Sequence, residues 1–125
     1  MADPGKRVVL LHNPRCSKSR AALLLLQERG VTVDVRRYLD EPLTRPELVE
    51  LAKQLGRPVS EWVRRGEEEY RAAGLGPDSS EAELLAALAK HPILLERPIA
   101  VLGRRAVVGR PPGAVLELFA DSGHF

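Results

Sequence analysis

Blocks of apolar and polar positions predict a strand, a helix and a second strand in the first part of the chain. Val8–Leu11 is an unbroken apolar run with β-branched residues, which is typical of a buried strand. Residues 17–29 form a strongly apolar helical stretch, and Gly30 after it is a helix stop signal. Residues 31–36 alternate between valine and polar side chains, the period-two pattern of a strand. Two parallel strands joined by a helix are the expected arrangement.

The middle of the chain, about residues 40–91, predicts a block of helices. Thr44 with Glu47, and Ser80 with Glu83, have the spacing of capping boxes. They predict helices that run to about residue 55 and to just before residue 92. Residues 60–65 predict a further short helix, whereas glycines mark loops around residues 67–73.

The last part of the chain predicts a β-hairpin and a helix. Residues 99–102 and 106–108 are short β-rich runs, and Gly103–Arg105 separates them. Residues 111–119 have the pattern of a helix with apolar contacts to a core. The order is therefore a βαβ half, a helical insertion and a ββα half. This α/β order predicts a thioredoxin-like fold in a single domain, residues 1–125, with the insertion at about 40–91.

Composition narrows the class of protein. The net charge of +2 does not indicate nucleic-acid binding. The single cysteine cannot form an internal disulfide, which favours a reducing compartment. Residues 1–7 lack the apolar stretch of a signal peptide, and the apolar run 21–26 is too short to span a bilayer. We expect a cytoplasmic protein without membrane segments, and no spacing of histidine and cysteine predicts a metal site.

The segment His12–Arg20, with the sequence HNPRCSKSR, lies between the first predicted strand and helix and carries the clearest chemical signal. A cysteine at a helix N-terminus meets unpaired backbone N–H groups and the positive end of the helix dipole. Arg15, Lys18 and Arg20 add positive charge, so the thiolate of Cys16 is favoured over the thiol. The same N–H groups form a cradle for an anion. We therefore interpret Cys16 as a nucleophile that attacks an oxyanion, although an inert small residue at a helix start is the alternative.

Other residues in and beyond this segment have open roles. Ser19 stands where a second cysteine would complete a Cys-x-x-Cys pair, so any disulfide of Cys16 must form with another molecule. His12 either holds charge near the thiolate or shapes the loop, and the alternative is a histidine at a strand end that is hydrogen-bonded to the backbone. Arg97 and Arg110 each precede a proline at an element boundary, whereas most other arginines and Glu67–Glu69 are expected to lie on a solvated surface.

Four further motifs follow His12–Arg20 in order along the chain. These are Tyr38–Leu39 with Pro42–Thr44 and Glu47–Leu48, Trp62–Arg65 with Tyr70, His91–Ile99, and Gly109–Pro111. With these five motifs the chain resembles the glutaredoxin-coupled arsenate reductases, a family that also includes Spx-like regulators. The resemblance covers the chain from Val8 to about Phe119.

This resemblance implies a mechanism and a set of site residues. Cys16 would attack arsenate and form a covalent arsenic–sulfur adduct. Arg64, Arg97 and Arg110 match the three oxyanion-binding arginines, and guanidinium groups suit a tetrahedral oxyanion. His12 and Ser19 match positions that tune the thiolate, and Pro98 is expected to follow a cis peptide bond. No cofactor is expected to be bound, and glutathione and glutaredoxin would be the reductants that release arsenite.

Two functions of different classes follow from the resemblance. One is a glutathione- and glutaredoxin-dependent reductase of arsenate, or of another small oxyanion. The other is an Spx-like protein that binds a protein partner, in which Cys16 is a sensor or a relic. Ser19 argues against the second, since Spx-like regulators usually carry a Cys-x-x-Cys pair. Well-studied reductases of this type also have a longer C-terminal tail.

Overall fold

The computed structural model of the chain describes residues 7–123, which fall into two compact units. The sheet unit consists of residues 7–38 and 97–123, and the helical unit of residues 39–96. The helical block predicted at about 40–91 is thus found as a compact unit of its own. That the two units make a single domain stays a prediction. Residues 1–6, on which the expectation about a signal peptide largely rests, lie outside the described residues.

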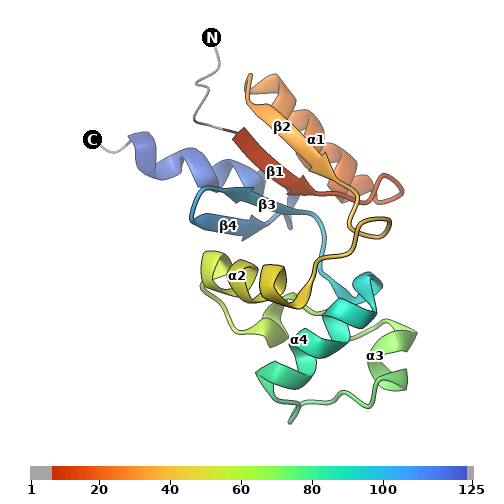
Figure 1. Ribbon diagram of the computed structural model, residues 1–125. Coiled ribbons are helices and arrows are strands. Elements are labelled where there is room, and N and C mark those ends of the chain that lie inside the picture. The colour runs from red at the N-terminus through yellow and green to blue at the C-terminus, as the bar shows by residue number, and fades with distance from the viewer. Residues whose placement is uncertain (1–6, 124–125) are drawn as a thin grey trace. The chain divides into compact units, whose positions relative to one another are not determined.

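The sheet unit contains a four-stranded mixed sheet with the order β2-β1-β3-β4 (Figure 1). β1 (Arg7–Leu11) and β2 (Thr32–Arg36) are parallel, and α1 (Ser17–Glu28) connects them. β3 (Ile99–Leu102) is antiparallel to β1 and to β4 (Arg105–Val108). The β3–β4 turn begins at Gly103 with a φ of 61°, as a type II′ hairpin turn requires at that position. The predicted βαβ half and hairpin are therefore confirmed.

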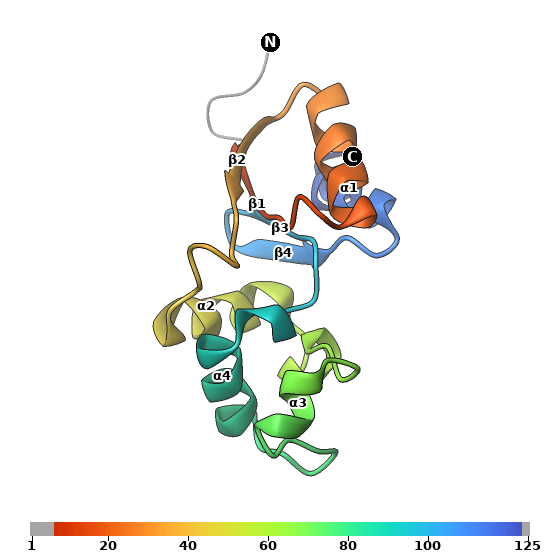
Figure 2. The same ribbon diagram turned by 90° about the vertical axis from the view of Figure 1, so that its right-hand side faces the viewer.

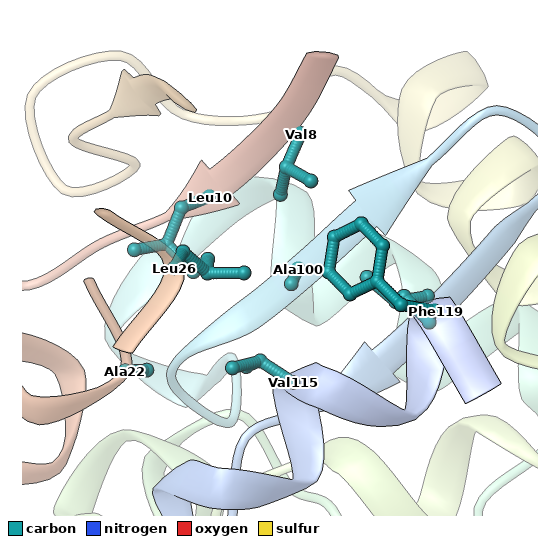
Figure 3. Packing of buried hydrophobic residues seen from close by; sticks show 8 residues of the cluster. Val8, Leu10, Ala22, Leu26, Ala100, Val115 and Phe119 are labelled. Atoms are coloured by element: carbon teal, nitrogen blue, oxygen red, sulfur yellow. The ribbon is translucent and has the colours of Figure 1, made fainter. Parts of the chain in front are cut away.

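One face of this sheet is covered by α1 and by η3, a 3-10 helix over Pro112–Gly123 (Figure 2). Side chains alternate along a strand, so Val8 and Leu10 of β1 both point to this face. On α1, Ala22 and Leu26 are four residues apart and share the helix side that meets them. The buried cluster in Figure 3 comprises Val8, Leu10, Ala22, Leu26, Ala100, Val115, Leu118 and Phe119. This packing fixes α1 on the sheet and holds its first residue just beyond the end of β1.

The helical unit contains α2 (Arg45–Leu55), η1 (Val59–Trp62), α3 (Glu68–Ala72), α4 (Glu81–Lys90) and η2 (Pro92–Leu94). Both predicted capping boxes form. Thr44 N donates to Glu47 Oε1 at 2.8 Å, and Ser80 N donates to Glu83 Oε1 at 2.7 Å. Their reciprocal bonds, from Glu47 N and Glu83 N to the hydroxyls, measure 3.3 and 3.1 Å. No helix within residues 7–123 is long and apolar enough to cross a membrane.

The helical unit departs from the sequence expectation in two places. The short helix expected at residues 60–65 is the 3-10 turn η1, and the chain becomes extended at Val63, which forms a β-bridge with Leu95. Trp62 and Val63 are both buried, so packing and the bridge prevail over the helical pattern. The loop expected around residues 67–73 contains α3. This helix has no buried residue, so no pattern of apolar positions in the sequence indicates it.

Candidate active site

The loop between β1 and α1 is folded tightly by its own backbone. Cys16 N donates to Asn13 O at 3.0 Å, and Arg15 N donates to the side-chain oxygen Asn13 Oδ1 at 3.0 Å. An asparagine that bonds to the backbone two residues ahead stabilises a turn at this point. Arg20 closes the loop from α1, since its Nη1 donates to Pro14 O at 2.9 Å. These bonds bring Cys16 to the N-cap of α1 in an extended conformation.

The N-cap position makes Cys16 a more acidic thiol. Burial by itself raises the pKa of Cys16. The backbone N–H of Ser19, the Arg97 side chain and the N–H of Lys18 favour the thiolate and outweigh burial. The pKa of Cys16 therefore lies below its ordinary value. The two N–H groups act as the helix end acts on any anion, although the sulfur makes no capping hydrogen bond of full geometry.

A buried network behind the cysteine joins His12, Asn13 and Ser19. Ser19 is completely buried; its Oγ lies 2.7 Å from His12 Nδ1 and accepts a hydrogen bond from Asn13 N at 3.0 Å. Burial, and then the charges of Arg37 and Arg20, lower the pKa of His12 below its ordinary value of 6.5. At neutral pH His12 is thus an uncharged hydrogen-bond partner. Of its two open roles, this geometry favours shaping the loop.

Arg97 and Arg110 lie on neighbouring loops of the sheet unit. The peptide bond between Arg97 and Pro98 is cis, as predicted, and the Arg110–Pro111 bond, about which no prediction was made, is also cis. Arg110 Nε donates to Arg97 O at 2.8 Å, and Gly109 N donates to Pro98 O at 2.8 Å. The side chain of Arg97 favours the thiolate of Cys16 over the thiol and so lowers the pKa of Cys16. The structure thus brings Cys16, Arg97 and the loop of Arg110 together within one unit.

Arg64 belongs to the helical unit, where two carboxylates hold it. Its Nε donates to Glu67 Oε2 and its Nη1 to Glu96 Oε1, both at 3.0 Å. Its backbone N–H donates to Leu94 O at 2.7 Å beside the bridge of Val63. Burial by itself lowers the pKa of Arg64. The bonds to both carboxylates raise this pKa by more than burial lowers it, so the guanidinium stays charged. That Arg64 converges on Cys16 stays a prediction.

The sequence of the chain is similar to those of known proteins in one family. Residues 11–118 match the ArsC family. The chain belongs to this family. It is 45% identical over 106 residues to the arsenate reductase of Neisseria meningitidis serogroup B, covering 83% of this chain and 91% of that protein. It is 42% identical over 113 residues to the arsenate reductase of Haemophilus influenzae, covering 89% and 97%.

Solved structures of the ArsC family confirm the thioredoxin-like fold. The arsenate reductase from Vibrio cholerae matches with a TM-score of 0.85 and 44% identity, over 90% of this chain and 97% of that one. In every described part of the chain, no group of three His, Cys, Asp or Glu side chains is placed to hold a metal ion.

Sequence reasoning missed three contributors to this region. Asn13 was given no role of its own within the HNPRCSKSR segment, although an Asn-Pro pair after a strand is a signal for such a turn. Gly109 was part of a motif without a role, and its close packing is visible only in the structure. Glu67, expected on a solvated surface, pairs instead with Arg64. A carboxylate three residues after an arginine was the available signal.

Proposed function

We propose that this chain reduces arsenate to arsenite and that Cys16 is its nucleophile. The observation that carries the proposal is the Cys16 thiol at the N-cap of α1, with its pKa lowered by backbone N–H groups and by Arg97. Membership of the ArsC family and the names of its relatives support arsenate as the substrate. In the first step the thiolate attacks arsenic, forms an arsenic–sulfur bond and expels an oxygen as water. Arsenic remains pentavalent in this adduct.

The reductant comes from outside the chain in this proposal. Conversion of arsenate to arsenite needs two electrons, which two thiols supply by joining in a disulfide. The sequence holds one cysteine, and Ser19 is completely buried where a Cys-x-x-Cys partner would stand. We propose glutathione as the second thiol. It forms a mixed disulfide as arsenite leaves, and glutaredoxin then reduces that disulfide.

The arginines have distinct roles in this proposal. Arg97 stabilises the thiolate and, with Arg110 held at its carbonyl, offers guanidinium groups to the oxyanion. Arg64 is proposed as the third donor, since its Nε and Nη1 are held by carboxylates and its Nη2 is the remaining nitrogen. His12 and Ser19 position the loop behind the cysteine. We propose no bound cofactor.

Arsenate reduction by the purified protein tests this function. The protein is supplied with arsenate, glutathione, glutaredoxin and a glutathione reductase, and consumption of NADPH is followed. We expect arsenate-dependent turnover that is lost in Cys16→Ser and kept in the matched variant Ser17→Ala, whose side chain is exposed. Replacing glutaredoxin by a thioredoxin system identifies the coupling. No turnover with either reductant, together with a complex between the protein and a macromolecular partner, would favour the regulator alternative.

A further inference from the structure

The charge of this chain is divided unevenly between its two units. Residues 7–38 and 97–119 carry eleven arginine and lysine residues against three acidic residues, whereas residues 39–96 carry seven against twelve. The small net charge of the whole chain hides this division. The acidic residues of the sheet unit in these ranges lie away from the cysteine loop. Glu28 ends α1, Asp34 pairs with Arg7, and Glu117 lies in η3.

Three exposed cations lie within four residues of Cys16 in the cysteine loop and the first turns of α1, and we call Arg15, Lys18 and Arg20 the cationic rim. Arg15 directly precedes Cys16, and Lys18 lies in the first turn of α1. Arg20 is turned back toward the loop by its bond to Pro14 O. Among the side chains that the structure describes, no carboxylate pairs with any of the three. No salt bridge therefore cancels the positive field of these three side chains. In contrast, two salt bridges cancel the field of Arg64.

We propose that the cationic rim recruits a small thiol that carries carboxylates, and selects it over uncharged thiols. This inference rests on the proposed function, in which an external thiol must reach the sulfur of Cys16. The rim spans only six residues, which fits a peptide of a few residues better than a protein, whose interface needs about 800 Å² per partner. Exposed cations around a reactive group raise the local concentration of anions and their rate of encounter. The thiolate of a peptide with free carboxylates is such an anion.

Thiol exchange at Cys16 isolates this step from arsenate chemistry. Cys16 is first converted to a mixed disulfide with pyridine thiol, an uncharged leaving group. The incoming thiolate attacks the Cys16 sulfur, forms a new S–S bond and expels pyridine thione, whose absorbance reports the rate. Two thiols are compared, glutathione and its diethyl ester, which has the same peptide without free carboxylates. Their rate ratio is divided by the same ratio for free dipyridyl disulfide, which removes differences in intrinsic reactivity.

We expect the normalised ratio to favour glutathione by about tenfold at about 0.01 M salt, and to approach one at about 1 M. In Arg15→Gln/Lys18→Gln the ratio falls by at least about threefold, whereas a general loss of reactivity slows both thiols equally and cancels. The matched control is Arg104→Gln/Arg105→Gln, which removes the same charge at the hairpin turn, at the opposite end of the sheet (Figure 1). It should leave the ratio nearly unchanged.

Three results would overturn the proposal: a ratio near one in the wild type at low salt, an equal fall in the hairpin control, or a ratio insensitive to salt. Arsenate is absent from the assay. A protein that shows the selectivity but does not reduce arsenate would therefore contradict the proposed function and leave this inference standing. A reductase without the selectivity would do the reverse.

Discussion

Replacing Gly109 by alanine should test how tightly the loops of Arg97 and Arg110 are built. A Cβ atom at position 109 would lie 2.8 Å from Pro98 Cγ and 2.9 Å from Val115 Cγ1. Ordinary contact begins near 3.4 Å, so each neighbour would have to retreat by about 0.5–0.6 Å. Val115 is completely buried and Pro98 nearly so, and neither can swing into solvent.

The cost follows from overpacking of a filled site. Extra methylenes in a well-packed core cost about 1–3 kcal/mol, and two contacts with rigid, buried neighbours place this change at about 2–3 kcal/mol. The displacement also reaches the cysteine, since Gly109 N is bonded to Pro98 O and Arg110 is bonded to Arg97 O. We expect a weaker effect of Arg97 on Cys16, and therefore a higher pKa of the Cys16 thiol.

Urea unfolding followed by circular dichroism measures the stability, and thiolate absorbance against pH measures the cysteine. Gly113→Ala is the matched control, because its Cβ would meet nothing within 4 Å and its φ is not in the left-handed region. That variant should be neutral or slightly stabilising. The reasoning is refuted if Gly109→Ala lies within about 0.5 kcal/mol of the wild type, or if both alanines cost the same.

Three further predictions concern the residues around Cys16. Arg97→Gln should raise the pKa of Cys16 and Arg97→Lys should restore part of the effect, as measured by alkylation rate against pH; an unchanged midpoint in Arg97→Gln would exclude the contact. Ser19→Ala should cost about 1–3 kcal/mol in urea unfolding, because it leaves the buried Asn13 N–H without its acceptor, whereas Ser17→Ala on the exposed side should cost little; equal losses would contradict this. The lowered pKa of His12 means that the unfolded chain binds more protons than the native state just below about pH 6.5, so stability should fall as the pH drops through this range. In His12→Asn this part of the fall between about pH 7 and pH 5 should disappear, and an identical pH profile would show that His12 does not titrate as described.

The fold was predictable because short stretches of sequence indicate its main helices and strands. The apolar run of β1, the alternation of β2 and both capping boxes are short-range signals, and each element forms within a few residues of its predicted bounds. The order of these elements then restricts the topology, since a strand–helix–strand unit gives parallel strands. The structure of residues 59–73 could not be predicted in this way. There the backbone follows the burial of Trp62 and the Val63–Leu95 bridge, which joins segments 32 residues apart.

Only the part of the candidate site that lies within a single sequence motif was predictable from local sequence. The HNPRCSKSR segment identifies Cys16, because the N–H groups of a helix N-terminus act on residues only a few positions away. The influence of Arg97 on Cys16 depends on the pairing of β1 with β3, which sets Leu11 opposite Ile99. Local spacing contains no trace of that pairing. Arg97 was noticed because it precedes a proline, but its role beside Cys16 entered the prediction through family resemblance. Glu96 was missed for the same reason, since it lies 32 residues beyond Arg64 along the chain, whereas Glu67, three residues from Arg64, had a local signal.

The two carboxylates on Arg64 change what this arginine can contribute to an oxyanion. The group of Arg64, Glu67 and Glu96 carries one positive and two negative charges, so its field does not attract a dianion from a distance. What the two bonds provide is orientation, because they fix the plane of the guanidinium and leave Nη2 as a donor of defined direction. Arg97 has the opposite character, since its charge acts directly on the thiolate. The charge that acts on the thiolate therefore comes from Arg97 in the sheet unit, whereas under the proposed function Arg64 adds geometric selection for a tetrahedral anion but little attraction. A lysine at position 64 would keep the positive charge but would have no planar guanidinium. The orientation that the two carboxylates give to Arg64 would therefore be lost.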